Sequence, residues 1–157
     1  MPRIRVSLGS NIEREAHIRA AVTELERHLG PARISPVYET DAEGFEGPAF
    51  YNLVTGHETE LPAEAVIKLF RQLEDELGRV RGDDRFDSRT IDIDLLTYGD
   101  MVAEVAGKKL PRDDITRYAF VLRPLAEIAG NLNIPGKGLL STLIAACENH
   151  SVRKLVV

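Results

Sequence analysis

Two aspartates separated by one residue, Asp92 and Asp94, are the clearest chemical signal in this sequence of 157 residues. Residues 89–96 around them alternate polar and apolar side chains, as a half-buried β-strand does. Residues two apart in a strand share a face, with Cα atoms about 6.6 Å apart, so the two carboxylates lie side by side. Such a pair repels unless a cation or a proton lies between. Because Mg²⁺ prefers oxygen ligands, the spacing predicts a magnesium site; two solvated acids on an exposed strand are the alternative.

A cluster of arginines lies directly before the aspartate pair. Guanidinium groups stay charged and bind phosphate oxygens through paired hydrogen bonds, so this cluster in an acidic protein indicates a polyphosphate. Ion pairs with acidic residues of the same loop are the alternative. Carboxylates that hold Mg²⁺ and arginines that hold phosphate are the two halves of a phosphoryl-type transfer site. The cluster consists of Arg79, Arg81, Arg85 and Arg89. The sequence has no glycine loop ending in Gly-Lys-Ser or Gly-Lys-Thr, which excludes a P-loop enzyme.

Hydrophobic periodicity predicts the elements that position these residues. The order is strand, helix, two strands, helix and strand, which is that of a ferredoxin-like fold. Ser10 or Asn11 is expected to cap the first helix. The apolar face of that helix is expected to consist of Ile18, Val22, Leu25 and Leu29. Strands are predicted at 3–8, 34–38, 50–57 and 90–98, and the second helix starts near Pro62 and ends at Gly78.

The rest of the chain adds a turn at 108–111, a short helix at 120–128 and a closing helix at 139–147. The prediction is therefore an α+β fold, with a ferredoxin-like βαββαβ core, a mainly antiparallel sheet and additional C-terminal helices. At this length we expect a single domain over residues 1–157.

Composition narrows the class of protein. Hydrophobic residues make up 43% and charged residues 29%, which are ordinary globular values. The net charge of −5 argues against a general nucleic-acid binder, which needs a basic surface. No apolar stretch is long enough to span a bilayer. The single cysteine, Cys147, forms no intramolecular disulfide, so we expect a cytoplasmic protein.

Several motifs occur together in a fixed order from about Val6 to Ile128. They are Ser7-Leu8-Gly9-Ser10-Asn11, Tyr38-x-Thr40, Asn52, Glu74, Gly78-Arg79-Val80-Arg81, Arg89-Thr90-Ile91-Asp92-Ile93-Asp94, Pro111 and Phe120-Val121-Leu122-Arg123-Pro124-Leu125. The motif Arg-Thr-x-Asp-x-Asp-Leu is the specific one. With these motifs, the chain resembles the 6-hydroxymethyl-7,8-dihydropterin pyrophosphokinase family of folate biosynthesis.

The resemblance implies transfer of the β,γ-diphosphate of ATP to the hydroxymethyl oxygen of the pterin, with AMP leaving. It implies that Asp92 and Asp94 bridge two Mg²⁺ ions, and that Arg81 and Arg89 join them as catalytic residues. The expected pterin-binding residues are Thr40, Phe50, Asn52 and Phe120. The expected ATP-binding residues are Glu74, Arg81, Arg85, Phe86, Arg89 and Arg112.

Physical reasoning supports the pterin pocket, because Phe50 and Asn52 share a strand face and so present a ring and an amide together. Core packing of Phe50 and Phe120, and a solvated Glu74, are the alternatives. The chain departs from the family at Asp41-Ala42, where the family has a proline, and at Arg112-Asp113, where it has a histidine. Tyr118 takes the place of an arginine.

Two other functions stay open at this point. One is a divergent relative that acts on another heteroaromatic alcohol; the other is a non-catalytic ferredoxin-like ligand-binding module. The carboxylate pair argues against the module, since a sensor needs no adjacent metal ligands. The expected partners are small-molecule substrates, with no nucleic acid, membrane or obligate protein partner.

Overall fold

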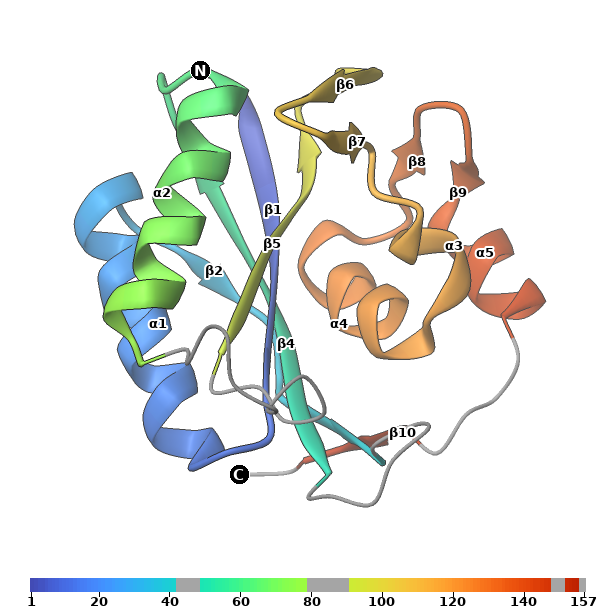
Figure 1. Ribbon diagram of the computed structural model, residues 1–157. Coiled ribbons are helices and arrows are strands. Elements are labelled where there is room, and N and C mark those ends of the chain that lie inside the picture. Colours follow the sequence, from blue (N-terminus) through green and yellow to red (C-terminus); the bar gives the residue numbers. More distant parts are fainter. Residues whose placement is uncertain (42–48, 79–90, 148–151, 156–157) are drawn as a thin grey trace.

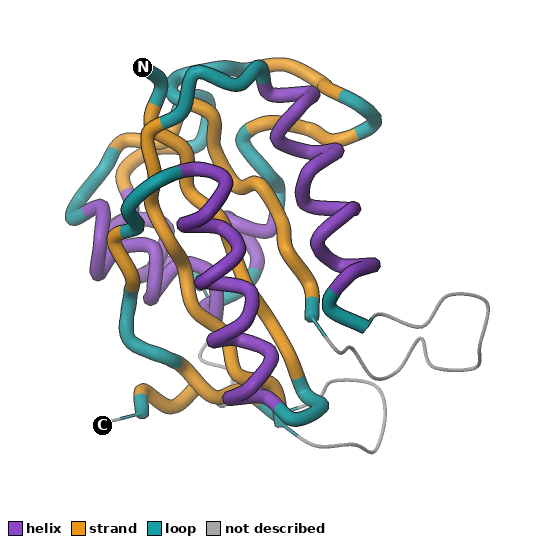
Figure 2. Tube along the Cα trace, turned by 90° about the vertical axis from the view of Figure 1, so that its left-hand side faces the viewer, coloured by secondary structure: helices purple, strands orange, loops and turns teal. Residues whose placement is uncertain are grey.

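The computed structural model describes residues 1–41, 49–78, 91–147 and 152–155 and has three layers, with a twisted sheet between two sets of helices (Figure 1). One face of the sheet carries α1 (Arg14–Leu29) and α2 (Ala63–Glu76). Figure 2, seen from that side, shows both helices in front of the strands. The other face carries α3 (Asp114–Arg117), α4 (Ala119–Ala129) and α5 (Leu140–Ala146).

The sheet is antiparallel throughout, in the order β10-β3-β4-β1-β5, and β2 also pairs with β4. Two small hairpins complete the described part of the chain. The strands of the sheet are β1 (Arg3–Ser10), β2 (Arg33–Ile34), β3 (Tyr38–Thr40), β4 (Phe50–Glu58), β5 (Asp92–Tyr98) and β10 (Val152–Lys154). The hairpins are β6 (Ala103–Val105) with β7 (Lys108–Leu110), and β8 (Asn133–Ile134) with β9 (Gly138–Leu139).

The predicted α+β fold, with its mainly antiparallel sheet and added C-terminal helices, is confirmed; the ferredoxin-like topology stays a prediction. None of the helices in the described ranges combines the length and the apolar character needed to cross a bilayer.

A hydrophobic core lies on each side of the sheet. Ile4, Val6 and Leu8 alternate along β1 and pack beneath α1 and α2. On the opposite face, Val54 and Leu96 pack against α4 and α5. Each fully buried aliphatic side chain contributes about 1.5–3 kcal/mol. Because successive strand residues face opposite ways, the polar residues of β1 lie on the α4 side, where they are free to build a site.

Helix α1 starts later than the sequence predicts. Its capping residue is Glu13, in the left-handed conformation with φ 44°, so the prediction of a cap at Ser10 or Asn11 is wrong. The Ser10 hydroxyl instead donates to the carbonyl oxygen of Ile12 at 3.1 Å, inside the bend that joins β1 to α1. Ala21 is fully buried while Val22 is only half-buried, since Ala21 lies three residues after Ile18 on the sheet-facing side.

The predicted strand at 34–38 is interrupted and forms two short strands, β2 and β3. Pro36 lies in the gap; it has no backbone N–H and cannot donate to a ladder. Ser35 holds the gap against the sheet, because its N–H donates to Val54 O and its hydroxyl accepts from Val54 N, both at 2.9 Å. Residues 108–110, predicted as a turn, form strand β7; the turn itself lies at Ala106 and Gly107, both with positive φ.

Candidate active site

Three residues in one row across the sheet form the floor of the candidate site. In the strand register, Gly9 on β1 lies opposite Asp92 on β5 and Asn52 on β4. Gly9 has no side chain, so a gap separates the carboxylate from the amide. A Cβ at this position would lie 3.1 Å from Asn52 Oδ1, closer than a real side chain tolerates without movement of the amide. The glycine therefore keeps the floor open.

The first cavity, which we call the aromatic cavity, has a volume of about 380 Å³ and lies over this floor. It brings together all four predicted pterin-binding residues, Thr40, Phe50, Asn52 and Phe120, with both aspartates. The sequence singled these six out, and the fold collects them from four separate elements. The remaining residues of its lining are Ser7, Gly9, Asp41, Asp114, Tyr118 and Val121.

Asn52 has an unused hydrogen-bond donor. Its side chain is only 5% exposed, and among the described residues its Nδ2 has no hydrogen-bond partner. A buried amide donor left without a partner costs about 1–3 kcal/mol. Since the residue lines the aromatic cavity, a ligand with an acceptor on its edge would satisfy it.

A stacked pair of rings forms one wall of the same cavity. Tyr118 and Phe120 lie with their centroids 4.9 Å apart and their planes 25° from parallel. Both residues are partly exposed and also pack against the core beside α4 and α5, so the structure bears out some core packing of Phe120. Sequence reasoning treated Tyr118 only as a departure from the family pattern, and the stack shows that it extends the aromatic surface.

The second cavity, which we call the basic cavity, has a volume of about 420 Å³ and shares Asp92 and Asp94 with the first. Its cationic lining consists of Arg71 on α2, Lys108 on β7 and Arg112 after it. The sequence predicted Arg112 as a phosphate contact but missed Arg71 and Lys108. Arg71 lies three residues before Glu74 on one helix face, a spacing that could have identified it.

Glu74 connects helix α2 to strand β5, which carries the two aspartates. The side chain is 7% exposed, and its Oε2 accepts a hydrogen bond from the backbone N–H of Ile93 at 2.9 Å. Ile93 lies between the two aspartates, so this contact fixes the strand that carries them. The alternative of a solvated Glu74 is wrong, because α2 packs directly on β5. The residue also lines the basic cavity, as an ATP contact would.

The predicted residues Arg81, Arg85, Phe86 and Arg89 lie outside the described residues, so their positions do not enter the geometry. Within the described ranges, no group of three or more histidine, cysteine, aspartate or glutamate side chains could hold a metal ion. The candidate ligands in the described ranges are the two neighbouring carboxylates of Asp92 and Asp94. This donor set fits Mg²⁺, which typically takes one or two carboxylates and completes its shell with water and substrate phosphates.

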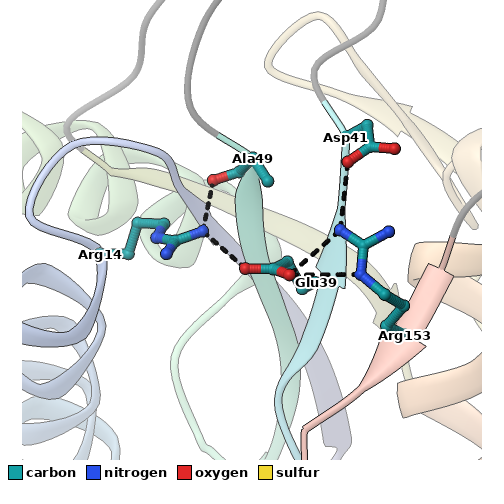
Figure 3. Close-up of polar contacts among 5 residues, drawn as sticks. All are labelled: Arg14, Glu39, Asp41, Ala49 and Arg153. Atoms are coloured by element: carbon teal, nitrogen blue, oxygen red, sulfur yellow. Dashed lines mark hydrogen bonds and ion pairs between the residues drawn. The ribbon is translucent and has the colours of Figure 1, made fainter.

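A network of ion pairs holds the edge of the aromatic cavity (Figure 3). Arg153 on β10 donates to Glu39 Oε1 at 3.0 Å and to Asp41 Oδ1 at 3.1 Å. From the other side, Arg14 donates to Glu39 Oε2 and to Ala49 O, each at 2.9 Å. The hydrogen bonds of Arg153 with Asp41 and Glu39 raise the pKa of its guanidinium group. Helix α1 and strand β10 are thus both tied to Glu39 on β3, the strand that carries Thr40, and β10 is also tied to Asp41.

The sequence matches the family model for 7,8-dihydro-6-hydroxymethylpterin-pyrophosphokinase over residues 5–130. Two bacterial relatives carry the name 2-amino-4-hydroxy-6-hydroxymethyldihydropteridine pyrophosphokinase. The Pseudomonas aeruginosa protein is 36% identical over 158 residues, covering 98% of this chain and 96% of the relative. The Bacillus subtilis protein is 38% identical over 127 residues, covering 78% of this chain and 75% of the relative.

The fold is similar to that of solved Plasmodium falciparum HPPK-DHPS chains. The wild type with SDX-DHP matches with a TM-score of 0.71 at 14% identity, covering 92% of this chain. This chain spans 43% of the length of that one, and the likeness concerns the fold alone. The residues matched by the family model include the aspartates and the lining of both cavities, and the Pseudomonas aeruginosa protein covers nearly the whole chain. The chain belongs to the 7,8-dihydro-6-hydroxymethylpterin-pyrophosphokinase family.

Proposed function

We propose that this chain transfers the β,γ-diphosphate of ATP to the hydroxymethyl group of 6-hydroxymethyl-7,8-dihydropterin and releases AMP. The single observation that carries the proposal is the shared wall: Asp92 and Asp94 line both the basic and the aromatic cavity. A transfer enzyme has to bring two substrates together at the group that moves. Family membership points to the same reaction.

In the proposed arrangement, the basic cavity binds the nucleotide. Arg71, Lys108 and Arg112 supply positive charge for phosphate oxygens. The resemblance adds Arg81, Arg85, Phe86 and Arg89 as nucleotide contacts. Asp92 and Asp94 would hold Mg²⁺, and two ions are proposed. When bound, the metal neutralises charge on the transferred diphosphate.

The aromatic cavity binds the pterin. Phe50 and Phe120 offer faces for a flat bicyclic ring, and the free Nδ2 of Asn52 donates to an acceptor on its edge. Thr40, at the end of β3, contributes a hydroxyl to the same space. These contacts orient the hydroxymethyl group toward the aspartates.

Positioning and charge stabilisation supply most of the proposed catalysis. The hydroxymethyl oxygen forms a bond to the β-phosphorus while the bond from that phosphorus to the α,β-bridging oxygen breaks, which frees AMP. The hydroxymethyl proton passes to a carboxylate of the Asp92–Asp94 pair. Arg81 and Arg89 spread the developing negative charge.

The test is AMP release from ATP and Mg²⁺, measured with and without 6-hydroxymethyl-7,8-dihydropterin. We expect release only with the pterin, and a fall in turnover of about 10²-fold or more in Asp94→Asn. Asn52→Ala should raise the KM for the pterin and spare the affinity for an unreactive ATP analogue. Glu64→Gln, an exposed change on α2, is the matched control.

The outcomes separate the possible functions. Without pterin-dependent AMP release the acceptor assignment fails, and another heteroaromatic alcohol becomes the substrate to seek. Full activity of Asp94→Asn at saturating Mg²⁺ would remove the metal proposal.

We also propose that residues 1–157 form one domain and that it works in the cytoplasm, which the use of ATP and the single cysteine support.

A further inference from the structure

A second row of residues crosses the sheet beyond the candidate active site. Arg5 on β1 and Arg33 on β2 both lie opposite Gly56 on β4. Directly opposite residues of neighbouring strands share a face, so two arginines flank a glycine. Neighbouring strands lie about 4.8 Å apart, which puts the two arginine Cα atoms about 10 Å apart, within reach of one ligand. The glycine lets Ile128 pack between them, since a Cβ at this position would lie 3.4 Å from Ile128 Cδ1.

These two guanidinium groups have no partners in the described ranges: neither forms a hydrogen bond or an ion pair there. Arg3, in the next row, donates to Glu58 at 3.3 Å. Burial and the like charges of Arg3 and Arg33 lower the pKa of Arg5, against the opposite pull of Asp100. Three positive groups are therefore held close together with too few counter-charges. Such an arrangement costs free energy unless an anion relieves it.

The arginines lie in the lining of a cavity of about 740 Å³, which shares no residue with the aromatic or the basic cavity. Apolar side chains form part of its walls: Leu29, Pro31, Leu61 and Ile128. Two acids also line it, but Glu58 is engaged by Arg3. The cavity thus offers two cations, unpaired within the described ranges, beside apolar surface, which suits a molecule with an anionic group and an apolar body.

We propose that Arg5 and Arg33 form a second ligand site, separate from the active site, for a small molecule bearing a phosphate or carboxylate group. The planar fork of each guanidinium matches the oxygens of either group. Ile128, which packs over Gly56, belongs to the same lining and gives the ligand an apolar contact beside the two side chains. The apolar wall packs against the rest of the ligand and favours an organic anion over an inorganic one.

The test is an NMR titration of the full chain in which Mg²⁺ and an unreactive ATP analogue fill the basic cavity and the pterin alcohol fills the aromatic cavity. The probes are inorganic phosphate and benzoate, at constant ionic strength. We expect saturable shifts of the Arg5 and Arg33 side-chain signals and of the Gly56 amide. Arg5→Gln and Arg33→Gln should each weaken probe binding about tenfold or more, as loss of a charge-assisted contact does. Arg27→Gln, an exposed arginine paired with Glu24, should change nothing.

Thermal melts distinguish a ligand site from a structural role. Without added anion, Arg5→Gln should not lower the melting temperature, since it removes a charge repelled by its neighbours. Shifts that follow chloride equally, or affinities unchanged in both variants, would overturn the proposal. So would a dimer in sedimentation that Arg33→Glu dissociates, because the face would then be an interface between two copies. None of these outcomes depends on the activity assay, because each measures binding, stability or assembly and none measures turnover.

Discussion

Because Gly9 has no side chain, the amide of Asn52 can lie close to the backbone of β1. The backbone of Gly9 does not adopt a left-handed conformation, so alanine is acceptable to the chain itself. The obstacle is the 3.1 Å approach of a Cβ to Asn52 Oδ1. This glycine therefore serves the site more than the strand.

We predict that Gly9→Ala keeps or slightly raises the melting temperature, because alanine has fewer unfolded conformations to lose, by about 0.4–1 kcal/mol. The KM for the pterin alcohol should rise, since the Asn52 amide has to move. Affinity for an ATP analogue is the internal control and should stay at the wild-type value. A large fall in melting temperature would show that the glycine is needed for folding instead.

His57 gives the stability of the molecule a pH dependence. Its ring is buried, with Nδ1 3.3 Å from Gly30 O and Nε2 3.0 Å from Thr55 Oγ1, and burial lowers its pKa below the ordinary value of 6.5. The unfolded chain then binds the proton more readily than the folded chain does. Stability should fall as the pH drops from about 6.5 toward the lowered pKa. Between pH 7.5 and 5, the melting temperature should depend less steeply on pH in His57→Gln than in the wild type. An equal dependence in both proteins would contradict the prediction.

Some site residues are readable from the sequence and others are not. Asp92 and Asp94 can be predicted, because aspartate is depleted in strands and two carboxylates on one strand face repel each other. Asn52 and Phe50 follow from strand periodicity. Arg71 has only its spacing from Glu74 as a signal, and Lys108 has none, since a cation on a hairpin resembles any solvated residue. Only the packing of α2 and the β6–β7 hairpin beside β5 brings them to the carboxylates.

At the scale of elements, length decides what the sequence predicts. The eight residues of β1 and the fourteen of α2 contain a full hydrophobic period, so both are predictable. Strand β10 and helix α3 have three and four residues, too few to show a period. Their places depend on tertiary contacts, such as the ion pairs of Arg153 with Glu39 and Asp41.

Strand β10 should therefore influence the aromatic cavity although it contributes no lining residue. We predict that Arg153→Met raises the KM for the pterin with little change in kcat, because Asp41 and the end of β3 lose their tie. The melting temperature should change little, since exposed ion pairs stabilise weakly. Arg19→Met removes an exposed ion pair with Glu15 on α1 and is the matched control. An equal effect of both variants on KM would refute the role of β10.

At the scale of the whole molecule, one sheet separates two cores; the aromatic cavity lies on the face of the C-terminal helices, while α2 on the other face lines part of the basic cavity. We predict that the layers unfold together. Leu25→Ala on α1 and Leu125→Ala on α4 both create a cavity at a fully buried position. Each should lower the free energy of unfolding by about 2–5 kcal/mol. Urea unfolding followed by far-UV circular dichroism and by tyrosine fluorescence should give coincident transitions in both variants. A separate early transition in Leu125→Ala would show that the C-terminal helices unfold independently.

The carboxylate wall between the two cavities also makes their occupancies interdependent. Charge placed on one side of Asp92 and Asp94 changes the electric field that a molecule on the other side experiences. Such coupling is reciprocal: the factor by which the nucleotide changes affinity for the pterin alcohol equals the factor by which the alcohol changes affinity for the nucleotide. In the proposed arrangement, the two aspartates between the cavities thus make each substrate an effector of the other before any bond is broken.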